Sequence, residues 1–209
     1  MKDVNKILDV LEKTYPDAKC ELNYTTPFEL LVATILSAQC TDVRVNKVTE
    51  ELFKKYNTAR AFSKLSVDQI SEEIKSCGLY KSKSQKIKAT SEMLCELYDG
   101  QVPDTLDKLV ELPGVGRKTA NVVLSNAFNQ DAMAVDTHVF RVANRIGLVQ
   151  TQTPEKTEFE LMDVIPKKRW SHSHHLLIFH GRRICKARKP ECEICPIKND
   201  CSYYKEGND

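Results

Sequence analysis

Four of the eight cysteines crowd into the last part of this 209-residue chain, with the spacing Cys185-x6-Cys192-x2-Cys195-x5-Cys201. Four thiolates can hold a tetrahedral zinc ion or an iron–sulfur cluster. Structural zinc sites usually present two short CxxC pairs, and here only Cys192 and Cys195 are that close, so a loop wound round a bulkier iron–sulfur cluster fits better. Zinc remains the alternative, whereas disulfides are not expected in a cytosolic protein of this size. The remaining cysteines are scattered through helical patterns and are predicted to be small buried hydrophobic residues: Cys20, Cys40, Cys77 and Cys95.

A second segment that can do chemistry is residues 112–120, which read LPGVGRKTA and lie between two helical patterns. Gly114 and Gly116 allow a tight turn, and Val115 between them is expected to anchor that turn in the core. Backbone amides at the start of the following helix, together with the positive end of its dipole, can bind a phosphate. For a bare GxG pattern, a plain turn between two helices is the alternative.

Charge is informative through its distribution rather than its total. The formal net charge is only +2, which does not by itself indicate a polyanionic partner. Residues 167–189 contain no acid, and a stretch of this kind suits a phosphate backbone or a solvated surface equally well. Its basic residues are Lys167, Lys168, Arg169, Arg182, Arg183, Lys186, Arg188 and Lys189. The last three lie between Cys185 and Cys192, so cross-linking that loop is expected to hold them towards phosphates.

The elements that must position these residues are predicted to be helices, because period-2 alternation is almost absent. Helices are expected over about 4–11, 27–39, 42–56, 67–77, 81–97, 105–112, 117–128, 137–146, 154–165 and 170–183. The predicted N-caps are Thr26, Thr41, Ser66, Asp104, Asp136 and Thr153. Gly78 is expected to close its helix as a C′ glycine. No apolar stretch is long enough for a membrane span or a signal peptide, so a cytoplasmic protein is expected.

Three features together resemble the endonuclease III family of helix-hairpin-helix DNA repair glycosylases, along nearly the whole chain. They are the LPGVGRKTA hairpin, the VDTHVFR segment at 135–141, and the cysteine spacing with Pro196 directly after Cys195. The resemblance implies an all-α, two-domain fold with an iron–sulfur cluster loop. The implied domains are a six-helix domain over about 21–130 with its helix-hairpin-helix at about 104–128, and an iron–sulfur domain of 1–20 plus 131–209 with the cluster loop at 185–201.

The same resemblance implies that Lys118 is the nucleophile, that Asp136 is the essential carboxylate, and that the four clustered cysteines hold a 4Fe–4S cluster. The residue types suit this chemistry. Cleaving a glycosidic bond builds positive charge on the sugar, which a carboxylate can stabilise. An uncharged amine can attack C1′, and the resulting iminium lets the 3′ phosphate leave by β-elimination. The helix dipole and partial burial would disfavour a cation at Lys118, whereas Asp136 would favour one; an exposed lysine and a simple N-cap are the alternatives.

Members of this family open the duplex with a glutamine and a leucine, and Gln39 and Leu79 match those positions. Gln39 can hydrogen-bond the orphaned base, and Leu79 can wedge between base steps. An ordinary loop residue and a Schellman-type apolar contact are the alternatives. The other expected DNA contacts are Gly114, Val115, Gly116, Arg117, Lys186, Arg188 and Lys189. For His138, local bonding is preferred over contact with DNA.

The resemblance therefore implies a bifunctional base-excision repair enzyme. It would remove oxidised pyrimidines as a DNA N-glycosylase and cleave 3′ to the abasic site through a Lys118 Schiff base. The alternatives are a monofunctional adenine-type relative, which typically lacks the hairpin lysine, and a non-catalytic helix-hairpin-helix DNA-binding protein. The expected partner is double-stranded DNA with damaged bases or abasic sites. A monomer in the bacterial cytoplasm, associated with the nucleoid and not with a membrane, is expected.

Overall fold

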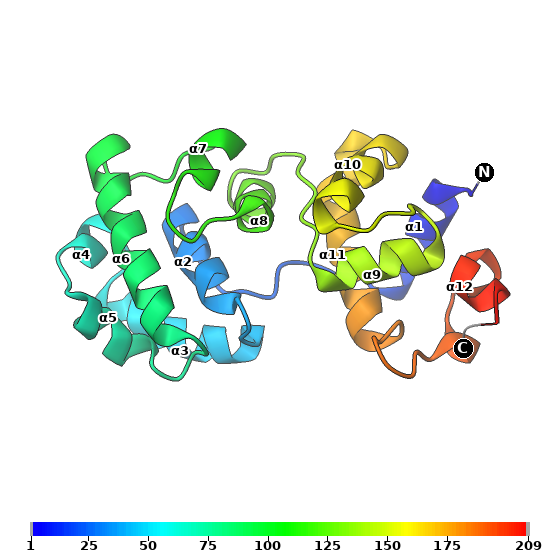
Figure 1. Cartoon of the computed structure of the whole chain (residues 1–209), viewed down its shortest axis with the longest axis horizontal. Helices are drawn as coiled ribbons and strands as arrows, with labels where there is room; N and C mark the ends of the chain where they lie inside the picture. The colour runs from blue at the N-terminus through cyan, green and yellow to red at the C-terminus, as the bar shows by residue number, and fades with distance from the viewer. Residues whose placement is uncertain (1, 208–209) are drawn as a thin grey trace. The chain divides into compact units, whose positions relative to one another are not determined.

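A computed structural model describes residues 2–207, and the regular secondary structure in this range is entirely helical, as the sequence predicted (Figure 1). The chain divides into two compact units. The central unit is Glu21–Gln130, and the terminal unit combines Met1–Cys20 with Asp131–Asp209. No helix within residues 2–207 is both long and apolar enough to cross a membrane.

The central unit contains α2 (Pro27–Ser37), α3 (Asp42–Lys55), α4 (Ala59–Ser63), α5 (Val67–Ile74), α6 (Tyr80–Leu97), α7 (Leu106–Val110) and α8 (Arg117–Ala127). This is one helix more than the six expected. The missed helix, α4, has five residues, which is too short to show a helical period in the sequence. Its start is nevertheless marked by Thr58, whose side chain accepts a hydrogen bond from the amide of Ala61.

Helix α2 forms the centre of this unit. Every residue from Phe28 to Leu36 is buried, and α2 packs against α3, α6 and α8. A helix that is buried on all sides must satisfy any charge it carries. Glu29 does so by accepting hydrogen bonds from the amide of Thr25 at 2.6 Å and from its hydroxyl at 2.7 Å. The helix that precedes the Gln39 loop is therefore a rigid support.

The terminal unit contains α1 (Val4–Thr14), α9 (Thr137–Ile146), α10 (Pro154–Val164), α11 (Trp170–Arg183) and α12 (Ser202–Lys205). Short 3-10 turns lie at Lys167–Arg169, Cys192–Ile194 and Lys198–Asp200. Helix α1 packs on α11, and α11 packs on α9, so the first and last parts of the chain share one core. Leu8 and Leu11 of α1 are completely buried in it. An ion pair of 3.0 Å between Lys6 and Asp200 adds a polar link between the two ends.

Most local signals in the sequence are confirmed. Five of the six predicted N-caps have side chains that accept hydrogen bonds from the first turns of their helices: Thr26, Thr41, Ser66, Asp136 and Thr153. The prediction for Asp104 is wrong, because α7 begins one residue later, with Thr105 as its N-cap and no side-chain capping hydrogen bond. The prediction of four small buried cysteines outside the clustered set is mostly wrong. Only Cys77 is buried, whereas Cys20, Cys40 and Cys95 are partly exposed.

Candidate functional site

The hairpin between α7 and α8 is held firmly in the central unit. Val115 is 5% exposed, which confirms that it anchors the turn. Its amide donates to the carbonyl of Leu112 at 3.0 Å, and the Thr90 hydroxyl donates to the carbonyl of Pro113 at 2.6 Å. Thr90 belongs to α6, so the turn is fixed to that helix as well as to its own neighbours.

The two hairpin glycines serve different purposes. Gly114 has φ +80°, and a Cβ atom added there would lie 2.9 Å from Cδ of Lys86. Glycine is therefore required at this position by both backbone conformation and packing. Gly116 has φ −88°, and a Cβ atom there would meet nothing within 4 Å. Gly116 is not needed for folding, and the open space beside it leaves room for an approaching ligand.

The start of α8 can bind an anion. Gly116 caps this helix without a side-chain hydrogen bond, and Arg117 and Lys118 follow in its first turn. The first amides of a helix and the positive end of its dipole attract phosphate. The side chain of Lys118 is exposed, so the partial burial considered from the sequence is not observed. An exposed amine next to the open space at Gly116 can reach a ligand bound there.

Asp136 is held as the N-cap of α9. Its Oδ1 accepts from the amides of His138 and Val139, each at 2.8 Å. Among the described residues, its Oδ2 has no hydrogen-bond partner. The helix therefore orients the carboxylate and leaves one oxygen available to a ligand. Asp136 and Lys118 belong to different units.

The preference for local bonding by His138 is confirmed. Its Nδ1 lies 3.2 Å from Nη2 of Arg141, one turn along α9. Burial lowers the pKa of His138, although the neighbouring Asp136 raises it. Arg141 also donates to the carbonyl oxygens of Gly181 and Cys185, each at 3.0 Å from Nη2. The helix that Asp136 caps is thereby joined to the start of the cysteine-rich segment.

The two residues expected to open the duplex share an unusual backbone conformation. Gln39 has φ 54° and Leu79 has φ 59°, both in the left-handed region that non-glycine residues seldom adopt. Both side chains are exposed, with Leu79 at 57%. A buried Schellman contact at Leu79 is therefore not observed. Strained backbone at exposed positions is typical of functional loops.

Gly78 was predicted to be a C′ glycine, and this is wrong. Helix α5 ends at Ile74 and is capped by Lys75, and Gly78 is not left-handed. A Cβ atom at Gly78 would instead lie 3.1 Å from the carbonyl oxygen of Gln39. The structure thus brings the two loops together, and Gly78 permits that close approach.

A buried lysine supports the same pair of loops. Lys83 on α6 is 3% exposed, and its Nζ donates to the carbonyl of Leu36 at 2.8 Å. This carbonyl lies in the last turn of α2, where helical partners run out and where the dipole favours a cation. Lys83 therefore ties the helix that follows Leu79 to the helix that precedes Gln39.

The four clustered cysteines are brought together round one pocket of the terminal unit. Cys185, Cys192, Cys195 and Cys201 line about 330 Å³ of space not filled by atoms. Within residues 2–207, no group of three or more His, Cys, Asp or Glu side chains is placed to hold a single metal ion. Four thiols that line one pocket are a donor set suited to an iron–sulfur cluster.

Hydrogen-bond donors point at these sulfurs, as a bound anionic cluster requires. Nε2 of His180 lies 3.6 Å from Sγ of Cys195, and Nη1 of Arg145 lies 3.8 Å from Sγ of Cys185. The other ring nitrogen of His180 lies 2.8 Å from the hydroxyl of Tyr15. Burial lowers the pKa of His180 to about 4 and raises that of Tyr15 to about 12, so both are neutral near pH 7. With Tyr15 donating to Nδ1, Nε2 carries the proton that faces Cys195.

Three basic residues of the stretch 167–189 form ion pairs with acidic residues, so the stretch carries less unpaired positive charge than its sequence suggested. Arg169 pairs with Asp9 at 2.8 Å and Arg183 pairs with Asp17 at 2.7 Å, and both acids come from the N-terminal segment. Within the cysteine-rich loop, Lys186 pairs with Glu191.

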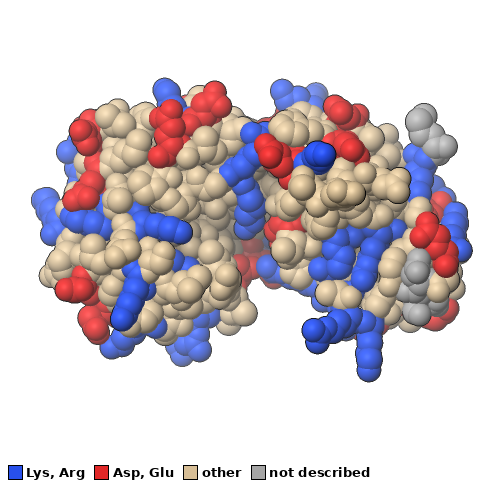
Figure 2. Space-filling model, in the orientation of Figure 1, with Lys and Arg blue, Asp and Glu red and all other residues tan. Residues whose placement is uncertain are grey.

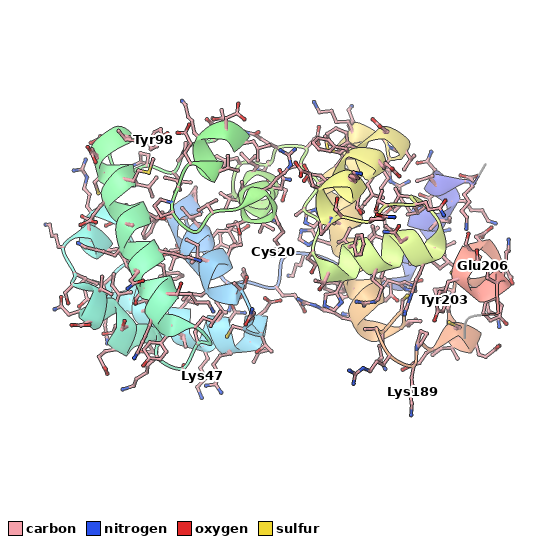
Figure 3. The ribbon with its side chains drawn as sticks, in the orientation of Figure 1. Cys20, Lys47, Tyr98, Lys189, Tyr203 and Glu206 are labelled. Carbon is pink, nitrogen blue, oxygen red and sulfur yellow. The ribbon has the colours of Figure 1, made fainter. Side chains whose placement is uncertain are left out.

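Arg188 and Lys189 are exposed and make no ion pair with any described residue. Figure 2 shows Lys and Arg side chains projecting from the end of the terminal unit where the loop after α11 lies. In Figure 3 the labelled Lys189 extends from this loop away from the ribbon. Of the three basic residues expected to face phosphates, these two are the best placed to do so.

Comparison with known proteins identifies the family. Residues 32–167 match the HhH-GPD superfamily of base excision DNA repair proteins, and residues 185–201 match the iron–sulfur binding domain of endonuclease III. The chain is 53% identical to endonuclease III of Rickettsia conorii over 201 residues, which are 96% of each protein. It is 46% identical to endonuclease III of Escherichia coli over 96% of this chain and 95% of that one. A solved structure, a trapped endonuclease III–DNA covalent intermediate, superposes with TM-score 0.94 at 46% identity, covering 99% of this chain and 97% of that one.

This chain belongs to the endonuclease III family. The expected cofactor, a 4Fe–4S cluster, is confirmed by the match of residues 185–201. This endonuclease III relative also has residues that support the cysteine-rich segment and that the sequence analysis missed. Arg141 and Arg145 lie four residues apart on one face of α9, and His180 lies five residues before Cys185. Their helical spacing was visible, but their targets are backbone carbonyls and sulfurs that only the fold brings near.

The hairpin glycines of this endonuclease III relative give a matched pair of variants. Gly114→Ala is expected to lower the free energy of unfolding by about 1–3 kcal/mol, because the methyl group meets Lys86 and the backbone is left-handed. Gly116→Ala is expected to change it by less than about 0.5 kcal/mol, because its Cβ enters open space. Denaturant unfolding of both variants measures the difference, and equal losses would contradict the distinct roles assigned to the two glycines.

The cysteine assignment can be tested by iron content. Replacing any one of Cys185, Cys192, Cys195 and Cys201 with alanine is expected to reduce bound iron and the visible absorbance of the cluster, because each thiol lines the shared pocket. Cys95→Ala is the matched control, because Cys95 hydrogen-bonds to Ser63 in the central unit, and it should retain both signals. Full iron content in a variant of the four would remove that cysteine from the ligand set.

Proposed function

We propose that Lys118 and Asp136 are the catalytic pair of this enzyme. The chain is a base-excision repair enzyme, a bifunctional DNA glycosylase and abasic-site lyase of the HhH-GPD superfamily. The observation that carries the proposal is the exposed Lys118 amine in the first turn of α8, beside a hairpin with room for a phosphate. Asp136 complements it with a carboxylate that α9 holds by one oxygen.

The reaction begins at C1′ of an extruded deoxyribose. The uncharged Lys118 amine attacks C1′ while the bond to the damaged base breaks, and the base leaves with the bonding electrons and takes up a proton. Positive charge that develops on the sugar is stabilised by the carboxylate of Asp136 through its available Oδ2. The proposal requires both side chains to reach the same sugar.

The second half of the reaction nicks the strand. Opening of the sugar ring gives an iminium between Lys118 and C1′, which withdraws electrons and acidifies the protons on C2′. Loss of one such proton lets the 3′ phosphate leave by β-elimination, and water then releases the product from the lysine. Oxidised pyrimidines and abasic sites are the substrates that we assign to this sequence of steps.

The DNA-binding residues complete the proposal. The amides at Gly114, Gly116 and Arg117 bind a backbone phosphate at the positive end of α8. Val115, whose amide already donates to the carbonyl of Leu112, contributes to DNA binding by anchoring the turn that presents them. Gln39 and Leu79 enter the duplex where the damaged base has been extruded. Their strained backbones hold the two side chains outward, which reduces the conformational freedom lost on binding.

The terminal unit holds the cofactor in this proposal. Cys185, Cys192, Cys195 and Cys201 are its ligands, and when bound the cluster cross-links the loop that carries Arg188 and Lys189. We assign Lys186 a weaker part in DNA binding because Glu191 pairs with it. The proposed domains are residues 21–130, with the hairpin, and residues 1–20 plus 131–209, with the cluster. The relatives are bacterial, so the proposed location is the cytoplasm, with the nucleoid DNA.

Borohydride trapping tests the role of Lys118. The enzyme should form a covalent adduct with abasic-site DNA when borohydride reduces the iminium, and Lys118→Ala should form none because no amine reaches C1′. Lys64→Ala is the control, because Lys64 is exposed at the end of α4 and has no assigned role. An adduct of equal yield with Lys118→Ala would overturn the assignment.

Leu79→Gly separates stability from function. Glycine adopts the left-handed backbone of Leu79 without strain, so the free energy of unfolding should be unchanged or up to about 1 kcal/mol higher. Base removal from a duplex should nevertheless fall, because the wedge is lost. Asn129→Gly is the matched control, since Asn129 is also exposed with φ 53° but has no assigned role. Normal base removal by Leu79→Gly, measured in single turnover, would contradict the wedge.

A further inference from the structure

Two cysteines lie directly beside the loops that carry Gln39 and Leu79. Cys40 follows Gln39, and Cys77 comes two residues before Leu79. The backbones of the two loops approach closely where Gly78 faces the carbonyl of Gln39, and the side chains of Cys40 and Cys77 lie close enough to interact electrostatically. These two thiols belong to no site described above.

The thiols differ in accessibility and share a cationic neighbour. Cys77 is 1% exposed, whereas Cys40 is partly exposed. Burial raises the pKa of Cys77 to about 11, so this residue stays a thiol near neutral pH. The ammonium of Lys83 interacts with both sulfurs, and burial lowers its own pKa. Cys40 is the partly exposed member of the pair, so it is the thiol that a small oxidant in solution can reach.

We propose that Cys40 and Cys77 are a peroxide-sensitive pair whose disulfide locks together the two loops that carry Gln39 and Leu79. The pair is a site of oxidative modification, and hydrogen peroxide is its reactant. The proposed disulfide is supported by the proximity of the two loops and their thiols. Its effect on activity rests on the function proposed for Gln39 and Leu79.

The chemistry balances in two steps. The Cys40 thiolate attacks one oxygen of hydrogen peroxide, the O–O bond breaks, and the departing hydroxide takes a proton to give water and a Cys40 sulfenic acid. The sulfur of Cys77 then attacks the sulfur of Cys40, and the proton of Cys77 leaves with the hydroxyl group as a second water. The two thiols lose two electrons in total, and one peroxide becomes two waters.

The disulfide would restrict the loops. A disulfide bond is about 2.05 Å long, which is shorter than any non-bonded contact between two sulfurs, so the segments must draw together. Gln39 and Leu79, which lie beside the two cysteines and enter the duplex in the proposed function, already have left-handed backbones. Their backbones therefore have little room to adjust. The oxidised enzyme should therefore open a duplex poorly, while a single-stranded abasic site, which needs no duplex opening, should remain a substrate.

Peptide mapping tests the disulfide. The intact enzyme is treated with about one equivalent of peroxide, remaining thiols are blocked, and tryptic peptides are weighed without reduction. The expected product links residues 20–44 to residues 76–81 with the loss of two hydrogens. The first peptide also contains Cys20, so Cys40→Ala should abolish the link and Cys20→Ala should keep it. No linked peptide in an enzyme that retains its cluster absorbance would overturn the redox pair.

Activity measurements test whether the disulfide restricts the two loops. Oxidised enzyme should lose base removal from a duplex, keep nicking of a single-stranded abasic strand, and regain the lost activity with dithiothreitol. Cys77→Ala is exposed to the same peroxide as a control for cluster damage and should lose nothing. An equal loss in Cys77→Ala, or a full disulfide with unchanged base removal, would overturn the lock. Reduced enzyme without any base removal would instead overturn the function proposed above, while the linked peptide would still report on the redox pair.

Discussion

The terminal unit depends on two arginines of α9 that hold backbone carbonyl groups. Arg141 donates to the carbonyls of Gly181 and Cys185, and Arg145 donates to those of Lys186 and Ala187. These carbonyls lie at or beyond the end of α11, where helical hydrogen bonds run out. A guanidinium satisfies several of them at once because its donors have a fixed planar geometry. Since α9 begins at Asp136, one rigid helix sets both the carboxylate and the start of the cysteine-rich loop.

In the central unit, a single helix supports every element assigned to DNA. Three residues of α6 do this work. Lys83 closes α2 beneath the Gln39 loop, Lys86 packs against Gly114, and Thr90 holds the carbonyl of Pro113. Left-handed residues in loops cost of order 1 kcal/mol each and persist only where the surroundings fix them. The contacts of α6 supply those surroundings for the loops to which we assign DNA binding.

The sequence predicted what local interactions decide. Asp136 caps the helix that follows it, Val115 is buried between two glycines, and four cysteines within one short segment meet at one pocket. Some of the failures involve partners distant in sequence. Gly78 is small because of Gln39, which is 39 residues earlier in the numbering. Cys40 was assigned to the core because helical periodicity does not show where an exposed loop begins.

The same limit applies to charge. Residues 167–189 contain no acid, yet Asp9, Glu12 and Asp17 of the N-terminal segment neutralise Arg169 and Arg183.

Because salt screens charges, local ion pairing matters more for DNA binding than the total net charge of the protein. At physiological ionic strength a charge acts over about 8 Å, so a paired arginine contributes little to attraction at a distance. The net charge of +2 therefore says little about DNA binding, and the basic residues that remain without an ion pair in the described part of the loop say more. Arg188 and Lys189 are two such residues, and they lie on backbone bounded by Cys185 and Cys192. In the proposed function, a cluster bound at those cysteines would fix the positions of these two charges, and a nearly neutral protein would then present a local cationic surface to DNA.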